Sequence, residues 1–488
     1  MARGVVVASV VLGACSATEV ADPSDSTTAP TSEAEAVKWT CPAGSPAGAR
    51  CSRVEVPADW SEPGGPTVSL PVVVVPATGL EPRPDPLVVP AGGPGGSSTG
   101  VAAQWSDPHR DIVLYDQRGT GAAEPSLACP ERNDAWIANL QRDAPFDEER
   151  AAIVAAFDAC RDRLEAGGVD LDDYDTEANV RDLDAIRTAL GYDEWNILGV
   201  SYGARLALAA MRSTPQGIRS VVLDSVYDVT SGGLAATQAS GERAFAELAR
   251  ACGHDASCGA AHPDLAAEID AVERRYSSAP VHVDVDLDDG HGPQTFVITG
   301  ADMVAGLFQA MYDPQLLALL PSIIGNLADG DTSIIGELVR RNVATQDETA
   351  WGMNLAVNCA DNAGLDADSD TDTDAAAVAD PGRFRLLIAV PLCSEWPVEA
   401  TSGTFNDPVH SDIPALVVAG RFDPITPPGG SRAVADRLED GTFALWPNRG
   451  HGVTGDPCAD TVMSAFLDHP TATVDLACVQ ALPGPRFG

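Results

Sequence analysis

Lysine is almost absent from this chain of 488 residues, because Lys38 near the amino terminus is the only one. Because the chain after Lys38 has no lysine, it cannot contain a P-loop lysine, a lysine that forms a Schiff base with pyridoxal phosphate, or a serine–lysine dyad. Acidic residues outnumber basic ones by 71 to 30, and the formal net charge is -41. Such a surface repels phosphate backbones and anionic lipids, so we expect no nucleic-acid partner and no direct binding to an anionic membrane.

Cysteine spacing of the C-x-x-C kind is missing as well, which argues against a metal site built from thiolates. The chain nevertheless has 11 cysteines, and setting Cys15 aside leaves an even number for disulfides. We expect neither a metal nor another cofactor. Sequence alone leaves the connectivity open, but pairing of nearest neighbours is the simplest proposal: Cys41 with Cys51, Cys129 with Cys160, Cys252 with Cys258, Cys359 with Cys393, and Cys458 with Cys478.

The amino-terminal residues 1–14 indicate an export signal peptide. Arg3 gives a positive start, and the apolar run that follows is too short to cross a bilayer. The run ends in Leu12-Gly13-Ala14-Cys15, which resembles a bacterial lipobox whose cysteine becomes lipidated. Residues 15–36 are polar and predict a flexible tether. We expect an exported monomer that reaches a membrane only through a lipid on Cys15, the alternative being an ordinary cleaved signal.

The stretch Gly199-Val200-Ser201-Tyr202-Gly203 matches the G-x-S-x-G pattern of a nucleophile elbow. Residues 194–198 predict a buried strand before it, and residues 204–211 predict a helix after it. This setting exposes the serine on a tight turn and points the N–H groups of the helix terminus at developing negative charge. The alternative is a tight turn with a small polar residue. Gly96-Ser97-Ser98-Thr99-Gly100 shares the pattern but lacks the flanking strand and helix, so we interpret it as coincidence.

Short apolar segments alternate with helical patterns in the first half of the chain, which favours a mostly parallel sheet flanked by helices, an α/β fold. Strand patterns stop near residue 228 and resume at residues 414–419. Residues 231–399 are therefore predicted to form a mainly helical lid, inserted between two parts of the sheet domain at residues 37–230 and 400–488. Strands are predicted at residues 68–75, 86–90, 111–115, 194–198, 218–223, 414–419 and 442–446, and a helix at residues 176–190.

A serine nucleophile needs a general base and an acid that orients the base. On a parallel sheet with a G-x-S-x-G elbow, the acid and the histidine follow the serine in that order along the chain. Asp423 lies in the turn after the predicted strand at residues 414–419. His451 is the one histidine of eight in a loop directly after a late strand. Asp224 and Asp228, which follow the preceding strand, remain alternative acids.

Two backbone N–H groups are expected to form an oxyanion hole. One belongs to Tyr202, the residue after the nucleophile, and the other to Gly92 or Gly93 in the glycine-rich loop after an early strand. Each such donor contributes on the order of 10²–10³ in rate. The alternative for this loop is a plain flexible turn. A dinucleotide-binding loop is excluded, because Pro94 interrupts the run and no G-x-G-x-x-G frame is present.

Taken together, these segments resemble the secreted bacterial tripeptidyl aminopeptidases, relatives of the proline iminopeptidases within the α/β-hydrolases. The resemblance covers about residues 40–480. It implies the α/β-hydrolase fold, hydrolysis of peptides from a free amino terminus and a lid over the site. Iminopeptidases usually have histidine before the first glycine, and Ala91 stands there in this chain, which argues against strict iminopeptidase specificity. The matching segments are Gly92-Gly93-Pro94-Gly95-Gly96, Asp116-Gln117-Arg118-Gly119, residues 195–203, Asn358-Cys359-Ala360-Asp361, and those around Asp423 and His451.

We therefore expect a serine exopeptidase that releases short peptides, tripeptides by resemblance, through an acyl-enzyme on Ser201. A carboxylesterase or lipase with the same triad is the first alternative. A non-catalytic binding lipoprotein on the same fold is the second, and the presence of all three triad residues disfavours it.

An aminopeptidase must also bind the α-ammonium group of its peptide substrate, and a buried ammonium needs anions and hydrogen-bond acceptors. Asp361 and Glu395 in the predicted lid are the candidates, and a Cys359–Cys393 disulfide would hold them near each other. Trp396 would add an aromatic face for the cation. The alternative is that both acids are ordinary surface residues.

Overall fold

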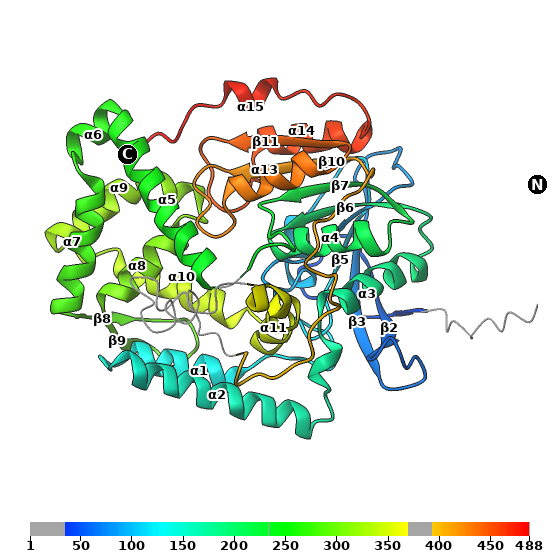
Figure 1. The fold of residues 1–488 in the computed structure, drawn as a ribbon, viewed down its shortest axis with the longest axis horizontal. Coiled ribbons are helices and arrows are strands. Elements are labelled where there is room, and N and C mark those ends of the chain that lie inside the picture. Colours follow the sequence, from blue (N-terminus) through cyan, green and yellow to red (C-terminus); the bar gives the residue numbers. More distant parts are fainter. Residues whose placement is uncertain (1–34, 233, 369–392, 488) are drawn as a thin grey trace, which may run out of the picture. The chain divides into compact units, whose positions relative to one another are not determined.

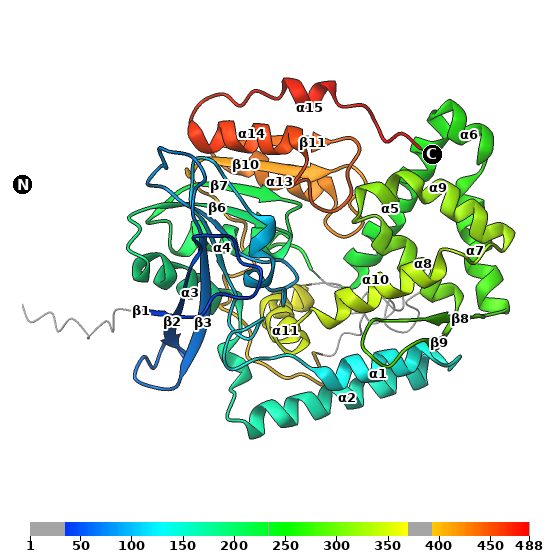
Figure 2. The same ribbon diagram turned by 180° about the vertical axis from the view of Figure 1, so that it is seen from behind.

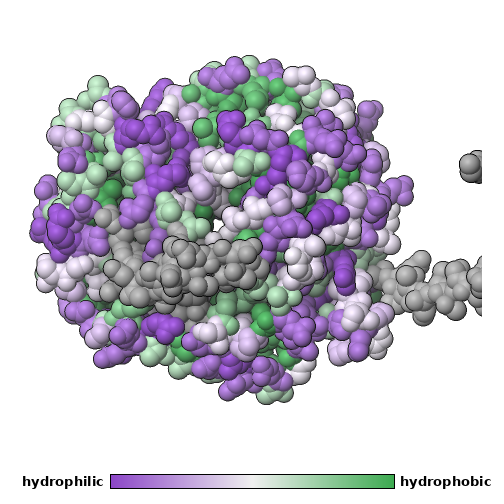
Figure 3. All heavy atoms as spheres, viewed as in Figure 1, coloured by the Kyte–Doolittle hydropathy of each residue, from purple (hydrophilic) through white to green (hydrophobic). Residues whose placement is uncertain are grey.

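The computed structural model describes residues 35–232, 234–368 and 393–487 (Figures 1 and 2). The expected signal peptide at residues 1–14 and nearly all of the tether at residues 15–36 lie outside these ranges. Within them, no helix has the length and apolar character that a membrane span requires. Hydrophilic side chains interrupted by smaller apolar patches cover most of the described face seen in Figure 3.

A nine-stranded sheet forms the framework of the fold, in the order β1-β2-β3-β5-β4-β6-β7-β10-β11. The first three pairings are antiparallel and the remaining five are parallel, which confirms the predicted mostly parallel sheet. The strands are β1 (Ala36–Lys38), β2 (Arg50–Pro57), β3 (Thr67–Val75), β4 (Leu87–Val89), β5 (Ile112–Tyr115), β6 (Trp195–Val200), β7 (Ile218–Asp224), β10 (Ala415–Gly420) and β11 (Gly441–Trp446).

Helices cover both faces of this sheet, and its central strands are rich in buried apolar residues, as buried parallel strands usually are. All six residues of β10 are buried. One face packs against α3 (Thr176–Ala189), α4 (Tyr202–Ser213) and α13 (Pro428–Arg437). The other packs against the 3₁₀ helix η1 (Thr99–Gln104), α14 (Pro457–Asp468) and α15 (Ala477–Ala481).

A largely helical segment, called the insertion below, separates β7 from β10 in the sequence. It shares one apolar cluster with α1 (Pro130–Leu140) and α2 (Phe146–Ala166), which run along it in both views (Figures 1 and 2). The helical layer therefore draws on residues from before the elbow as well. The described insertion contains α5 (Leu234–His254), α6 (Ala256–Ala261), α7 (Leu265–Ser278), β8 (Val281–Val285), β9 (Gln294–Ile298), α8 (Gly300–Ala310), α9 (Pro314–Asp329), α10 (Ile335–Asp347) and α11 (Trp351–Asp368).

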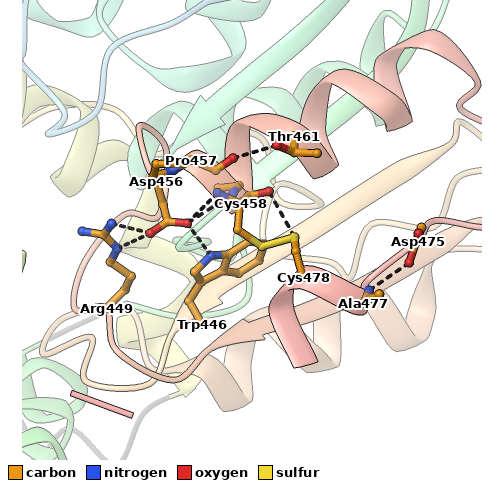
Figure 4. Close-up of a disulfide and its surroundings, with 10 residues drawn as sticks. Trp446, Arg449, Asp456, Pro457, Cys458, Thr461, Asp475, Ala477 and Cys478 are labelled. Atoms are coloured by element: carbon orange, nitrogen blue, oxygen red, sulfur yellow. Dashed lines mark hydrogen bonds and ion pairs between the residues drawn. A yellow bond between two sulfur atoms is a disulfide. The ribbon is translucent and has the colours of Figure 1, made fainter. Parts of the chain in front are cut away.

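The described residues contain five disulfides, and each joins two cysteines that the sequence predicts to pair as nearest neighbours. Cys129–Cys160 joins the start of α1 to the carboxyl-terminal half of α2, and Cys458–Cys478 joins α14 to α15 (Figure 4). Disulfides persist in oxidising compartments, so this set is consistent with export.

Candidate active site

Ser201 lies at the point where β6 turns into α4, with backbone angles φ 59° and ψ -118°. A positive φ at a residue other than glycine is strained, and such strain is typical of functional turns. The turn is fixed by two backbone hydrogen bonds, from Ser201 N–H to the Asp224 carbonyl at 3.0 Å and from Ala204 N–H to the Ser201 carbonyl at 3.0 Å. A side chain at Gly203 would come within 2.5 Å of the Pro90 carbonyl oxygen, which explains the second glycine of the motif.

The acid turn and the histidine loop lie side by side because they follow two neighbouring parallel strands. Gly420 at the end of β10 is in register with Trp446 at the end of β11. Beyond the strands, Phe422 N–H donates to the Arg449 carbonyl at 2.9 Å. This pairing brings Asp423 Oδ2 to 2.9 Å from His451 Nδ1.

Asp423 is fully buried, and its carboxylate is saturated by hydrogen bonds. Besides His451, it accepts the N–H groups of Ile425 at 3.0 Å and Thr426 at 2.8 Å. Burial opposes the charge, but the histidine and these donors outweigh it and lower the pKa of Asp423. Burial also disfavours the imidazolium, yet the adjacent Asp423 and the nearby Asp224 raise the pKa of His451 above its ordinary value. The Asp423 carboxylate therefore favours the protonated form of the His451 imidazole.

Thr426 is a further member of this site, to which the sequence assigned no role. Its hydroxyl donates to Asp423 Oδ2 at 2.8 Å and lies 3.1 Å from His451 Nδ1. It therefore contacts both members of the Asp423–His451 pair. The available signal was its position three residues after the predicted acid, where a hydroxyl can reach back across the turn.

The two alternative acids have other partners. Asp224 accepts the N–H groups of Val453 and Thr454, at 2.8 Å each, and so holds the chain that follows the histidine. Asp228 is paired with the Arg437 guanidinium through both carboxylate oxygens. Asp423 is thus the carboxylate that contacts the His451 ring.

The histidine loop reaches the elbow through the end of β7. Gly452 N–H donates to the Ser225 hydroxyl at 2.9 Å, one residue after the carbonyl that binds Ser201 N–H. In the described part of the chain, no hydrogen bond joins the Ser201 hydroxyl to His451. Catalytic hydrogen bonds are often long without substrate and tighten when it binds, so we expect this contact in the substrate complex.

The predicted oxyanion loop passes directly beside the nucleophile. A Cβ at Gly92 would lie 3.1 Å from the Val200 carbonyl oxygen and 3.4 Å from Ser201 Cβ, so a side chain there would press on the elbow. Gln117 donates to the Ala91 carbonyl at 2.8 Å and holds the start of the loop. Gly93 has φ 118°, a conformation that favours glycine.

Tyr202 opens α4, and the first N–H groups of a helix have no partner within the helix. The Tyr202 N–H and the glycine loop are therefore the candidates for the two oxyanion donors. The second G-x-S-x-G match behaves differently: Ser98 and Thr99 donate their N–H groups to the Asp116 carboxylate at 2.9 Å each and start the short helix η1.

The residues predicted to bind a substrate ammonium are only partly arranged for it. Asp361 is 1% exposed; it accepts the hydroxyls of Thr176 at 2.6 Å and Thr401 at 3.0 Å, and pairs with Arg205 at 3.4 Å. Its carboxylate is thus occupied by partners inside the protein.

The other two predicted residues, Trp396 and Glu395, differ in exposure. Trp396 is also 1% exposed and packs edge-on against Phe157 at 6.1 Å, so its ring offers no face to a ligand. Glu395 is half-buried, with Arg150 at 3.7 Å. The Cys359–Cys393 disulfide is formed. It does not give Asp361 and Glu395 a common partner, because the two side chains have separate partners.

Two protein-family models match the chain. The model described as "alpha/beta hydrolase fold" matches residues 85–248, which include the elbow, and confirms the predicted fold. The model described as "TAP-like protein" matches residues 382–478, which include the acid turn and the histidine loop. The two matched regions together contain Ser201, Asp423 and His451.

Several known proteins are similar to the chain over most of their length. "Carboxylesterase B" of Mycobacterium tuberculosis is 30% identical over 472 residues, which cover 88% of this chain and 86% of that protein. "Serine protease Hip1" of the same species is 29% identical over 455 residues, covering 86% and 85%. "Tripeptidyl aminopeptidase" of Streptomyces lividans is 27% identical over 485 residues, covering 89% and 85%.

Proposed function

We propose that this chain, which belongs to the α/β-hydrolase family and shares its TAP-like carboxyl-terminal region, is a serine exopeptidase that cuts short peptides from free amino termini. The observation that carries the proposal is the buried Asp423–His451 pair, 2.9 Å apart, beside a strained serine at an elbow. Serine hydrolysis needs this arrangement of nucleophile, base and orienting acid. Relatives named as a serine protease and a tripeptidyl aminopeptidase support a peptide as substrate.

In the proposed reaction, the Ser201 hydroxyl adds to the scissile carbonyl while His451 Nε2 takes its proton. Asp423 and Thr426 hold the ring so that Nδ1 keeps its hydrogen and Nε2 faces the serine. The N–H groups of Tyr202 and the Gly92–Gly93 loop bind the oxyanion. His451 then protonates the leaving amine, and a water molecule activated by the same base hydrolyses the acyl-enzyme.

Exopeptidase specificity requires a group that binds the charged amino terminus of the substrate and so fixes its distance from the scissile bond. We propose that the insertion, over residues 231–399, acts as a lid and supplies an anion for the substrate ammonium. Glu395 remains the candidate, because its side chain is 30% exposed, its arginine partner is 3.7 Å away and its other contact is the neutral hydroxyl of Ser394 at 2.5 Å. A weak existing ion pair leaves the carboxylate able to accept a second cation.

The experiment compares release of nitroaniline from a tripeptide-nitroanilide with release from its N-acetylated form. The proposal expects fast cleavage of the free amine, slow cleavage of the acetylated substrate and no cleavage of either by Ser201→Ala. Equal cleavage of both substrates by the wild type would contradict an ammonium site. If the preference survives Glu395→Gln, the anion lies elsewhere.

A carboxylesterase is the second candidate, and a specific observation favours it: the relative that is 30% identical is named Carboxylesterase B. The same triad and oxyanion hole hydrolyse esters, so the site geometry is neutral between the two. Hydrolysis of a short-chain nitrophenyl ester in the absence of any peptide cleavage would favour this alternative.

For the cellular context, we propose an exported monomer with a lipid on Cys15. The five disulfides support an oxidising compartment. Labelling of the full chain with a radioactive fatty acid, compared with Cys15→Ser, tests the lipid. Gel filtration of the released protein tests the oligomeric state.

A further inference from the structure

The insertion does more than adjoin the active site, because one of its side chains contacts the general base directly. The ring of Tyr312 lies 4.8 Å from the ring of His451, centroid to centroid, at an interplanar angle of 52°. Tilted aromatic pairs at this distance are attractive. Tyr312 is 111 residues beyond the nucleophile and 139 residues before the histidine, and it belongs to none of the catalytic turns.

Tyr312 is held in a tight connection between α8 and α9 (Figure 1). Its N–H donates to the Gln309 carbonyl at 3.0 Å. The next residue, Asp313, accepts the N–H of Gln315 at 2.7 Å and caps α9. Asp313 also pairs with Arg341 of α10 at 2.7 Å. The backbone that carries the ring is therefore fixed by three helices of the insertion.

The loop that carries His451 packs closely against the connection between α8 and α9. A side chain at Gly450 would overlap the carbonyl oxygen of Met311, so only glycine lets the two backbones approach so closely. Met311 itself is fully buried. The residue before the base and the residue before Tyr312 thus form one contact.

The insertion also touches the acid turn. Arg243 of α5 donates to the carbonyl oxygens of Asp423 and, at 3.3 Å, of Arg421. Burial lowers the pKa of this guanidinium, while Asp423 opposes the shift. Contacts from two different helical segments thus converge on the two members of the acid–base pair.

We propose that Tyr312 is a positioning residue for catalysis, whose ring holds the His451 imidazole toward Ser201 and keeps water from it. This proposal rests on the proposed serine chemistry. It goes beyond that chemistry, because it assigns to the insertion a role in positioning the general base. The ring, and not the hydroxyl, carries the effect. In the described chain, the Tyr312 hydroxyl has no hydrogen-bond partner.

The charged and titratable groups around His451 set the expected direction of a pH effect. Asp423 from the acid turn and Asp224 from β7 raise its pKa, whereas burial, to which the Tyr312 ring contributes, lowers it. The Arg243 guanidinium donates to the backbone carbonyl of Asp423. Removing the ring admits water to the imidazolium and leaves the carboxylates in place, so the pKa of His451 rises.

The test uses a nitrophenyl ester and the rate at which a fluorophosphonate labels Ser201, so it does not depend on peptidase activity. Tyr312→Ala is expected to lower kcat on the order of 10²-fold, with KM nearly unchanged, because a displaced base transfers protons poorly. The acid limb of its pH profile is expected to move to higher pH. Tyr312→Phe keeps the ring and is expected to retain wild-type kinetics and pH profile.

Tyr276→Ala is the control, because it removes a buried tyrosine ring of the insertion whose hydroxyl donates to the Leu327 carbonyl, away from the base. It is expected to cost stability and leave the pH profile in place. Unchanged kcat and pH profile in a folded Tyr312→Ala protein would overturn the proposal. So would equal losses in the Phe and Ala variants, which would assign the role to the hydroxyl. If the wild type hydrolyses the ester but no peptide, the peptidase function fails while this inference is still tested.

Discussion

Asp224 and Val453 are joined by a 2.8 Å hydrogen bond that runs from the end of β7 to the loop two residues beyond His451. A second bond, to Thr454 N–H, makes the carboxylate a clamp on that loop. Asp224 is fully buried, and burial raises its pKa although the bonded donors oppose the shift. The same β7 segment supplies the carbonyl that binds Ser201 N–H. Ser201 and the loop after His451 are thus both hydrogen-bonded to Asp224 at the end of β7.

Asp224→Asn is expected to impair catalysis by loosening the histidine loop, since the amide turns a donor toward N–H groups that need an acceptor. We expect a stability loss of about 1–3 kcal/mol by denaturant unfolding and a fall in kcat of at least about tenfold. Asp228→Asn is the control, because it breaks the ion pair with Arg437 without touching the loop. Equal effects of both variants on kcat would contradict the clamp.

Ester hydrolysis is expected to require the neutral imidazole, so activity should rise with pH through the pKa of His451. Because Asp423 raises that pKa, the acid limb is expected above the ordinary histidine value of 6.5. Replacing Asp423 by asparagine removes the charge that favours the imidazolium, and the limb should move to lower pH. In the same variant kcat should fall on the order of 10⁴-fold, as when the orienting acid of a serine triad is lost. A limb that stays in place would show that another group sets the pKa.

The Cys458–Cys478 disulfide lies just beyond the loop that carries His451 (Figure 4). In the same place, Asp456 accepts a hydrogen bond from Trp446 Nε1 at 3.3 Å and pairs with Arg449. Replacing both cysteines by serine is expected to cost about 2–4 kcal/mol of folding free energy. Since Asp456 still holds the loop, kcat should stay near the wild-type value.

The control for this disulfide is removal of Cys252–Cys258, whose sequence separation of 6 is shorter than the 20 of Cys458–Cys478. A shorter loop restrains the unfolded chain less, so its removal should cost less. Calorimetry of the two double variants decides the order of stability. A large drop in kcat for Cys458→Ser/Cys478→Ser would mean that the covalent link, and not Asp456, holds the histidine.

Local sequence predicted the elbow, the acid turn and the histidine loop, because each follows a short apolar strand and is marked by glycine or proline. Those signals lie within about ten residues of the chemistry. The contact of Tyr312 with His451 depends on how two helices pack against a loop 139 residues later, and no local pattern reports it. The burial of Asp361 was missed for the same reason, since Thr176, Arg205 and Thr401 come from three separate segments.

Gly92→Ala is expected to damage catalysis while leaving the protein folded. The new Cβ would lie 3.1 Å from the Val200 carbonyl oxygen and 3.4 Å from Ser201 Cβ, closer than most real contacts, so the loop must move away from the nucleophile. A displaced loop withdraws one oxyanion donor. The loss of one such donor lowers kcat on the order of 10²–10³-fold, with little change in substrate binding.

The size of that loss separates the oxyanion role from the plain flexible turn that the glycine run also allows. Gly64→Ala is the matched control, because a Cβ there meets nothing within 4 Å, and it should leave kcat unchanged. Kinetics on the nitrophenyl ester measure kcat and KM for both variants, and denaturant unfolding confirms that both remain folded. If Gly92→Ala raises KM and spares kcat, the loop contacts the substrate equally in ground and transition states, and the oxyanion hole must take its second donor from elsewhere.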